Sequence, residues 1–138
     1  MPSTRIVVDT GVLVSRLLLV NSLPAQAVRR AIENGRLLVS DATMMELADV
    51  LGRSKFDAYI SLADRQQFIR LLGRIAEFVT ILRHIRACRD PSDDKLLEVA
   101  VNGEADLVVS GDQDLLTMHP FMSIPILSPA DYLKTPKN

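Results

Sequence analysis

Residues 107–112 read LVVSGD, a β-branched apolar run that ends in an acidic residue. Residues 5–9 read RIVVD and have the same form. Short runs of this kind are typical of buried strands in a parallel sheet. Apolar runs at residues 37–39, 78–82 and 124–127 predict three further strands.

Helical patterns separate these runs. Pro24 opens one helix and Gly35 ends it, Ser40 or Asp41 caps the next, and Ser61 begins a third. Further helices are predicted at about residues 91–103, 113–118 and 130–133. Strands that alternate with helices at this spacing indicate a parallel sheet covered on both faces. The predicted fold class is therefore α/β, a three-layer α/β/α sandwich with a mainly parallel central sheet.

The composition indicates an ordinary globular protein. The 138 residues are 48% apolar and 24% charged, and no Gly/Ser-rich linker divides them, so we treat residues 1–138 as one domain. Sixteen Lys and Arg against 17 Asp and Glu give a formal charge of -1, which argues against a strongly basic nucleic-acid binder but allows a local basic patch. Cys88 is the single cysteine, which excludes an internal disulfide and a Cys-rich zinc site. No apolar stretch approaches the ~18–20 residues of a membrane span and no signal peptide is evident, so we expect a soluble cytoplasmic protein with no membrane partner.

Two of the predicted strands are followed by acidic residues. Asp9 ends the first run, and Asp112 comes shortly after the run at 107–110. Because the carboxyl ends of parallel strands meet at one edge of a sheet, these two carboxylates are expected to lie together there. The alternative is purely structural: Asp112 caps the following helix, and Asp9 starts a turn with Thr10 and Gly11.

A third acidic candidate lies in the segment that follows residue 89. Asp90 and Asp93 are accounted for as the cap and first turn of a helix. Asp94 remains, at the head of a buried stripe that continues with Leu97 and Val101. A charged group in that position needs a partner, and we expect a metal ion or a distant base.

Four segments, in this order, resemble the PIN domain, the nuclease fold of many bacterial toxin–antitoxin toxins of the VapC-like type. They are VVDTGVLVS at residues 7–15, EL at 46–47, DPSDDKLL at 90–97 and ADLVVSGDQDLL at 105–116. The resemblance spans nearly the whole chain, and the segment at 105–116 is its most specific part. Glu46 enters through this resemblance, because the helical pattern alone places it on a solvated face.

The resemblance implies a metal-dependent endoribonuclease, the toxin of a toxin–antitoxin pair. The family's acidic set falls on Asp9, Glu46, Asp94 and Asp112, with Asp114 as an auxiliary acid. The hydroxyl groups of Ser110 and Thr10 are expected to support these acids. Gly11 departs from the family pattern, in which asparagine is frequent at this position.

The chemistry of this set agrees with that implication. Carboxylate oxygens without nearby Cys or paired His suit Mg²⁺ or Mn²⁺. Our role hypothesis gives the principal ion to Asp9 and Asp94, with Asp112 completing its shell or acting through water. Glu46 would hold a second ion or orient the attacking water, and two such ions would clamp an in-line displacement.

An acidic pocket repels RNA, so cations must hold the substrate elsewhere. Arg53, Lys55 and Arg89 are candidates for phosphate contacts, and the alternative is a solvated charged surface. The resemblance further implies a cognate antitoxin protein and a homodimer.

Two other functions stay open at this stage. An aspartyl-phosphate phosphotransferase would use Asp9 as its nucleophile, although Gly11 occupies the position of the second acid that such enzymes need. A PIN-like scaffold would bind RNA or a protein without cutting.

Overall fold

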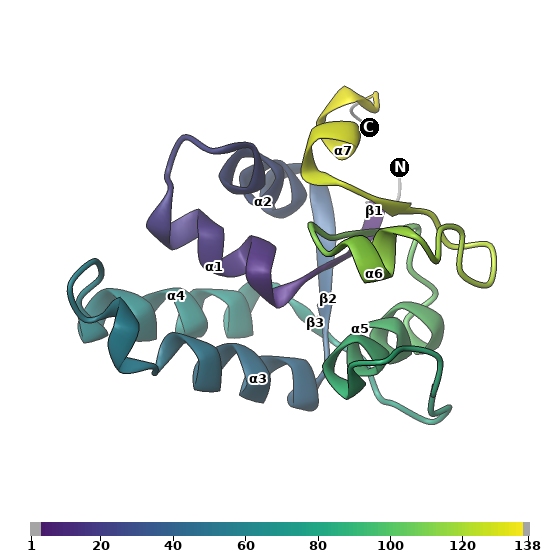
Figure 1. Ribbon diagram of the computed structural model, residues 1–138, viewed down its shortest axis with the longest axis horizontal. Coiled ribbons are helices and arrows are strands. Elements are labelled where there is room, and N and C mark those ends of the chain that lie inside the picture. Colours follow the sequence, from purple (N-terminus) through teal and green to yellow (C-terminus); the bar gives the residue numbers. More distant parts are fainter. Residues whose placement is uncertain (1–3, 137–138) are drawn as a thin grey trace.

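A five-stranded parallel sheet forms the middle layer of the protein in the computed structural model, which describes residues 4–136 (Figure 1). The strand order is β3-β2-β1-β4-β5, and every neighbouring pair is parallel. The strands are β1 (Thr4–Val8), β2 (Gly35–Val39), β3 (Glu77–Phe78), β4 (Leu107–Val109) and β5 (Ile126–Leu127). This arrangement confirms the predicted parallel sheet.

Helices cover both faces of the sheet. One face packs against α1 (Thr10–Leu18), α2 (Leu23–Asn34), α3 (Asp41–Leu51), α4 (Leu62–Ile75) and α7 (Pro129–Lys134). The other face packs against α5 (Pro91–Asn102) and α6 (Gln113–Leu116), which lie across the sheet from α1 and α3 in Figure 1. A short 3-10 turn, η1 (Ser54–Phe56), connects α3 to α4. The three-layer α/β/α class is confirmed.

The alternation of side chains along the strands explains the three layers. Ile6 and Val8 of β1 are buried in the core beneath α1 to α4, whereas Val7 between them is buried in the core beneath α5. Val108 and Val109 of β4 divide in the same way. A strand that buries both faces reads as a continuous apolar run, which is why these strands were visible in the sequence.

Three elements differ from the sequence expectations, and the first is the strand predicted at 124–127, of which only Ile126–Leu127 forms. Helix α1 was not predicted, because Asp9 caps it directly after β1 and its first turn contains Gly11 and Val12, which are weak helix formers. The strand predicted at 78–82 is only Glu77–Phe78, with one more hydrogen bond from the Val79 N–H to the Val39 carbonyl oxygen. Its partner β2 ends at Val39, so the chain beyond has no strand to pair with.

Within residues 4–136, no single helix has the length and apolar character needed to cross a membrane. Helices α1 and α2 pass that test only when taken together, and the chain bends by 106° between them.

Candidate active site

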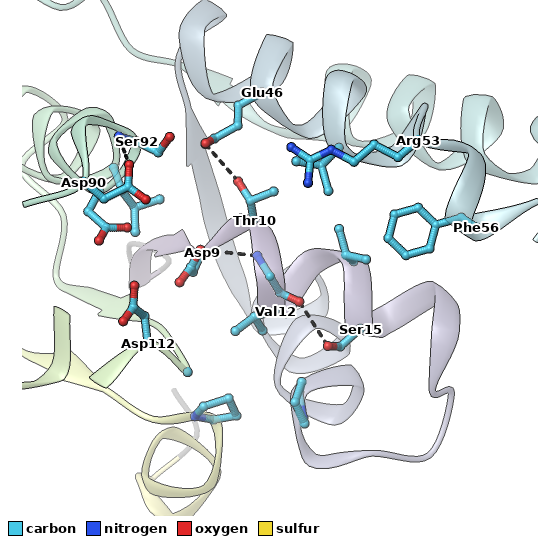
Figure 2. A pocket seen from close by; sticks show the side chains of 18 of the residues that line it. Asp9, Thr10, Val12, Ser15, Glu46, Arg53, Phe56, Asp90, Ser92 and Asp112 are labelled. Carbon is cyan, nitrogen blue, oxygen red and sulfur yellow. Dashed lines mark hydrogen bonds between the residues drawn. The ribbon is translucent and has the colours of Figure 1, made fainter. Parts of the chain in front are cut away.

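A cavity of about 650 Å³ opens at the carboxyl edge of the sheet (Figure 2). The elements around it are the start of α1, the middle of α3, the segment after α3, the start of α5 and the turn that follows β4. Five carboxylate side chains line it: Asp9, Glu46, Asp90, Asp93 and Asp112. Acidic side chains therefore lie together at this edge, as expected, but the set of acids differs in part from the expected one.

Ser110 connects the two acids that follow β1 and β4. The two strands pair in register, Val8 beside Val109, so Asp9 comes to lie beside Ser110. The Ser110 hydroxyl is fully buried, donates to Asp9 Oδ2 at 2.7 Å and accepts from the Asp112 backbone N–H at 3.0 Å. The Ser110 hydroxyl, expected to support the acid that follows it, thus hydrogen-bonds to the carboxylate of Asp9 and to the backbone of Asp112.

Burial raises the pKa of Asp9, and the hydrogen bond from Ser110 opposes that rise. The negative charges of Asp112 and Glu46 raise the pKa of Asp9 further. Asp9 thus lies in a low-dielectric, negatively charged environment that favours a bound cation.

Three of the five acids also cap helices. Asp9 is the N-cap of α1 and accepts from the Gly11 N–H at 3.3 Å. Asp90 caps α5, and Asp112 caps α6. The capping expected of Asp112 is therefore observed, whereas Asp9 begins helix α1 in place of the expected turn. Both side chains also line the cavity, so capping does not account for them alone.

Asp93 is the member of the set whose position in the sequence predicts only a place in the first turn of a helix. Its pKa is raised to about 7, first by burial and then by the charges of Asp112, Asp90 and Asp9. A hydrogen bond with Asp112 also raises it. The protonated form of Asp93 therefore relieves the crowding of negative charge in this part of the cavity.

Asp94, which was expected to bind the principal ion, lies outside the cavity lining. Its Oδ1 accepts from the backbone N–H groups of Ala87 at 2.9 Å and Cys88 at 2.8 Å, and these bonds lower its pKa. In the structure, this charge is partnered by backbone N–H groups of the preceding segment. Of the two neighbouring acids, the structure therefore places Asp93 on the cavity wall and Asp94 outside it.

Glu46 reaches the cavity from the middle of α3. It is half-buried, and the Thr10 hydroxyl donates to its Oε2 at 3.3 Å. Figure 2 shows the pair across from Asp90 and Asp112. The solvated position suggested by the helical pattern is therefore wrong, because α1 packs against α3 and covers that face.

Cationic side chains form another part of the wall. Arg53 and Lys55, in the segment between α3 and α4, line the cavity. Arg89 and Asp114 are exposed and lie outside the lining, and Asp114 contacts Asp112 only through its own backbone N–H. The Asp114 carboxylate, expected as an auxiliary acid, thus lies next to the cavity lining in sequence but is not part of it.

The donor set can be compared with what a divalent cation requires. Across residues 4–136, no three Asp, Glu, His or Cys side chains are gathered closely enough to hold one ion as they stand. The cavity acids nevertheless supply only oxygen donors, as Mg²⁺ and Mn²⁺ prefer. Their mutual repulsion, seen in the raised pKa of Asp93, is of the kind that a cation relieves. The donor atoms and charge of these residues therefore suit a hard divalent ion.

Comparisons with known proteins agree with the fold. Residues 5–114 match the family described as PIN domain. An uncharacterized protein of Methanocaldococcus jannaschii, MJ1680, is 24% identical over 118 residues, which are 83% of this chain and 74% of that protein. A chain in the crystal structure of VapBC2 from Rickettsia felis, bound to a DNA fragment from their promoter, superimposes with a TM-score of 0.63 at 10% identity and covers 91% of this chain and 98% of that chain.

Proposed function

This chain belongs to the PIN-domain family, and from that membership we propose that it is a metal-dependent endoribonuclease. PIN domains are generally nucleases that use divalent metals. The observation that carries the proposal is the convergence of five carboxylates on one cavity with Arg53 and Lys55 on its wall. Such a cavity combines oxygen ligands for a cation with positive charge for a phosphate backbone.

We assign the principal ion to Asp9, Asp93 and Asp112, and a second ion or the attacking water to Glu46 and Asp90. A cation held there would supply positive charge for a phosphodiester under in-line attack by water, in which the bond to the leaving ribose oxygen breaks as the new P–O bond forms and that oxygen takes a proton from solvent. Ser110 keeps Asp9 Oδ2 fixed, and the backbone N–H groups at the helix starts keep the capping carboxylates oriented. Because Thr10 holds Oε2 of Glu46, we assign the proton of the attacking water to the other oxygen, Oε1.

We propose that RNA is held mainly through its phosphates. Arg53 and Lys55 lie on the cavity wall, and Arg89, in the exposed segment before α5, is close in sequence to Asp90. The chain has four Phe, two Tyr and no Trp, so base stacking contributes little. Binding should weaken steeply as salt is raised.

Adjacent acids offer a matched test of the proposal. Asp93→Asn should reduce Mn²⁺-dependent cleavage of a single-stranded RNA by more than the roughly 10–100-fold that follows loss of an outer partner. Asp94→Asn, one position away and outside the cavity, should retain most of the activity. Cleavage should stop in EDTA. Full activity of Asp93→Asn, or RNA binding by the wild type without any metal-dependent cuts, would contradict the assignment, and the second result would favour a non-cleaving scaffold.

We also propose a cognate antitoxin as partner, in the cytoplasm. The similar structure from Rickettsia felis is that of VapBC2 bound to a DNA fragment from their promoter. On this chain a hollow of about 500 Å³ with both apolar and charged lining residues lies between α1 and α4, with Val20 54% and Tyr59 78% exposed. Co-purification of this chain with the product of a neighbouring reading frame, and loss of the complex in Tyr59→Asp, would support a protein partner there. A doubled mass of the chain alone would instead assign the surface to a homodimer.

A further inference from the structure

Arg65 of α4 is a buried cation whose hydrogen bonds all go to one stretch of chain. Its side chain is 3% exposed. The guanidinium donates to the Leu51 carbonyl oxygen and to Asp57 Oδ1, both at 2.8 Å, with longer contacts to the carbonyl oxygens of Arg53 and Ser61 at 3.4 Å. A charge buried in this way is unfavourable unless its donors are satisfied, and here satisfying them fixes the path of residues 51–61.

Residues 52–61, which we call the basic arm, form part of the wall of the acidic cavity. Arg53 and Lys55 of the arm are the Lys and Arg side chains among the residues that line it. Between them and the core lies Phe56, which is buried and carries the Lys55 ammonium 5.1 Å from its ring centroid. Figure 2 shows the Arg53 side chain reaching from the arm toward Thr10 and Glu46.

The positions of the two cations depend little on their own contacts. The Arg53 side chain is 54% exposed, and its one ion pair, with Asp49 at 3.8 Å, is long and solvated. The backbone beneath them is instead fixed by Arg65 and by burial of Phe56. A preorganised cation loses less conformational entropy when it binds a phosphate than a mobile one does.

We propose that Arg65 is a positioning residue for nucleic-acid binding: it holds the basic arm so that Arg53 and Lys55 contact phosphates of a strand that enters the acidic cavity. This role rests on the proposed function and specifies which part of the molecule binds the backbone of the substrate. The planar guanidinium fork serves several carbonyl and carboxylate oxygens at once, which a lysine ammonium in the same place cannot reproduce. Arg65→Lys is therefore the informative variant, because it keeps the charge and removes the geometry.

The state of the arm can be measured without any ligand. Trypsin cleaves after Arg53 and Lys55, and Arg65→Lys leaves a trypsin-sensitive residue at position 65. Limited digestion of the full chain should cut after Arg53 and Lys55 about tenfold faster in Arg65→Lys, the change expected when one or two buried hydrogen bonds are lost. Arg70→Lys, an exposed position on the same helix, is the matched control and should digest like the wild type.

Binding of RNA separates a positioning role from simple stabilisation. The probe is a fluorescein-labelled 20-nucleotide single-stranded RNA, titrated in EDTA so that no cleavage occurs. Arg65→Lys should weaken binding about tenfold and reduce the slope of log K against log salt by up to about 1.4. The double variant Arg53→Ala/Lys55→Ala, which loses two phosphate contacts, should show the full reduction of about 1.4. In that double background, Arg65→Lys should add nothing, because the cations it positions are gone.

Four results would overturn the proposal. An unchanged salt slope in Arg65→Lys, or a full additional loss in the Arg53→Ala/Lys55→Ala background, would show that Arg65 only stabilises the fold. No RNA binding by the wild type at any salt concentration, either in EDTA or with Mn²⁺, would remove the positioning role together with the proposed function. Normal RNA binding and salt dependence in Arg65→Lys despite a loosened arm would remove the positioning role alone.

Discussion

Asp93 and Asp94 are neighbours in the chain with opposite electrostatic surroundings. Successive helical residues differ by about 100° in direction, so the rotation of α5 decides which of the two meets the cavity. Burial of Leu96 and Leu97 against the sheet sets that rotation. Asp93 then faces Asp112 and has a raised pKa, whereas Asp94 faces the Ala87 N–H and has a lowered one.

This contrast predicts opposite effects on the thermal stability of the metal-free protein. Asp93 has a pKa of about 7 when folded against an ordinary value of 3.8, so folding retains its proton and the wild type loses stability as pH rises from about 4 to 7. The Tm advantage of Asp93→Asn should therefore grow over that range and stay constant above it. Asp94→Asn should lower the Tm at pH 7 by about 2–6 °C, since two backbone N–H groups lose a charged acceptor.

Calorimetry of both variants between pH 4 and pH 8 measures these effects. The stabilisation by Asp94 is present above its ordinary pKa of 3.8 and disappears only as pH falls through its lower folded pKa, so its loss should change little over this range. A Tm difference between Asp93→Asn and wild type that shrinks toward high pH would contradict the first expectation.

Helix α5 holds the segment that precedes it through hydrogen bonds with its side chains. Three of its side chains, spaced four residues apart, bind backbone N–H groups of residues 82–88. They are Asp94, Glu98 and Asn102. Four-residue spacing places them on one face of the helix, so the segment runs along that face. The segment ends at Asp90, which lines the cavity.

Asn102→Ala should loosen the far end of this segment. Asn102 Oδ1 accepts from the N–H groups of Leu82 and Arg83, and its Nδ2 donates to the Arg83 carbonyl oxygen at 2.8 Å. We expect a loss of about 1–2 kcal/mol in the free energy of unfolding. Amide hydrogen exchange at Leu82 and Arg83 should accelerate, whereas Lys95→Ala, an exposed change on the same helix, should leave both rates as they are. Unchanged exchange in Asn102→Ala would show that these bonds contribute nothing.

The elements also show what sequence alone can predict. Helices that begin with a clear cap, such as those after Ser40, Ser61 and Asp90, were found because capping is a local property. Helix α1 also begins with a cap, Asp9, but its first turn holds the weak helix formers Gly11 and Val12. Its stability comes from burial of residues such as Leu13, which is a tertiary property. The strand at 78–82 was overextended for the same reason, since its length is set by its partner and Leu82 is 85% exposed.

For the whole molecule, the position of the site follows from topology. Asp9 and Asp112 could be predicted to meet, because each follows a strand and the strands were predicted to be parallel. Glu46 required the family resemblance, since nothing in the pattern of α3 shows that α1 covers its face. The choice of Asp93 over Asp94 and the approach of Arg53 to the cavity depend on packing between elements distant in sequence.

Metal addition should stabilise the folded protein as a whole. Binding to the native state alone contributes about 2.7 kcal/mol when the ion is present at 100 times its Kd, which is a rise of roughly 6–15 °C in Tm. The Tm in 10 mM MgCl₂ should therefore exceed that in EDTA, and Asp9→Asn should abolish most of the difference. Asp114→Asn, outside the lining, should keep it. An equal response of these two variants would show that the ion binds elsewhere.

The capping acids give the site one more property. Asp9, Asp90 and Asp112 each begin a helix, and asparagine begins a helix as well as aspartate does, whereas alanine does not. Replacement by asparagine should therefore remove the charge needed for catalysis and keep the fold, whereas replacement by alanine should impair both catalysis and stability. A descendant of this protein that abandoned cutting but kept its shape would be recognisable by amides standing where its ancestor carried acids.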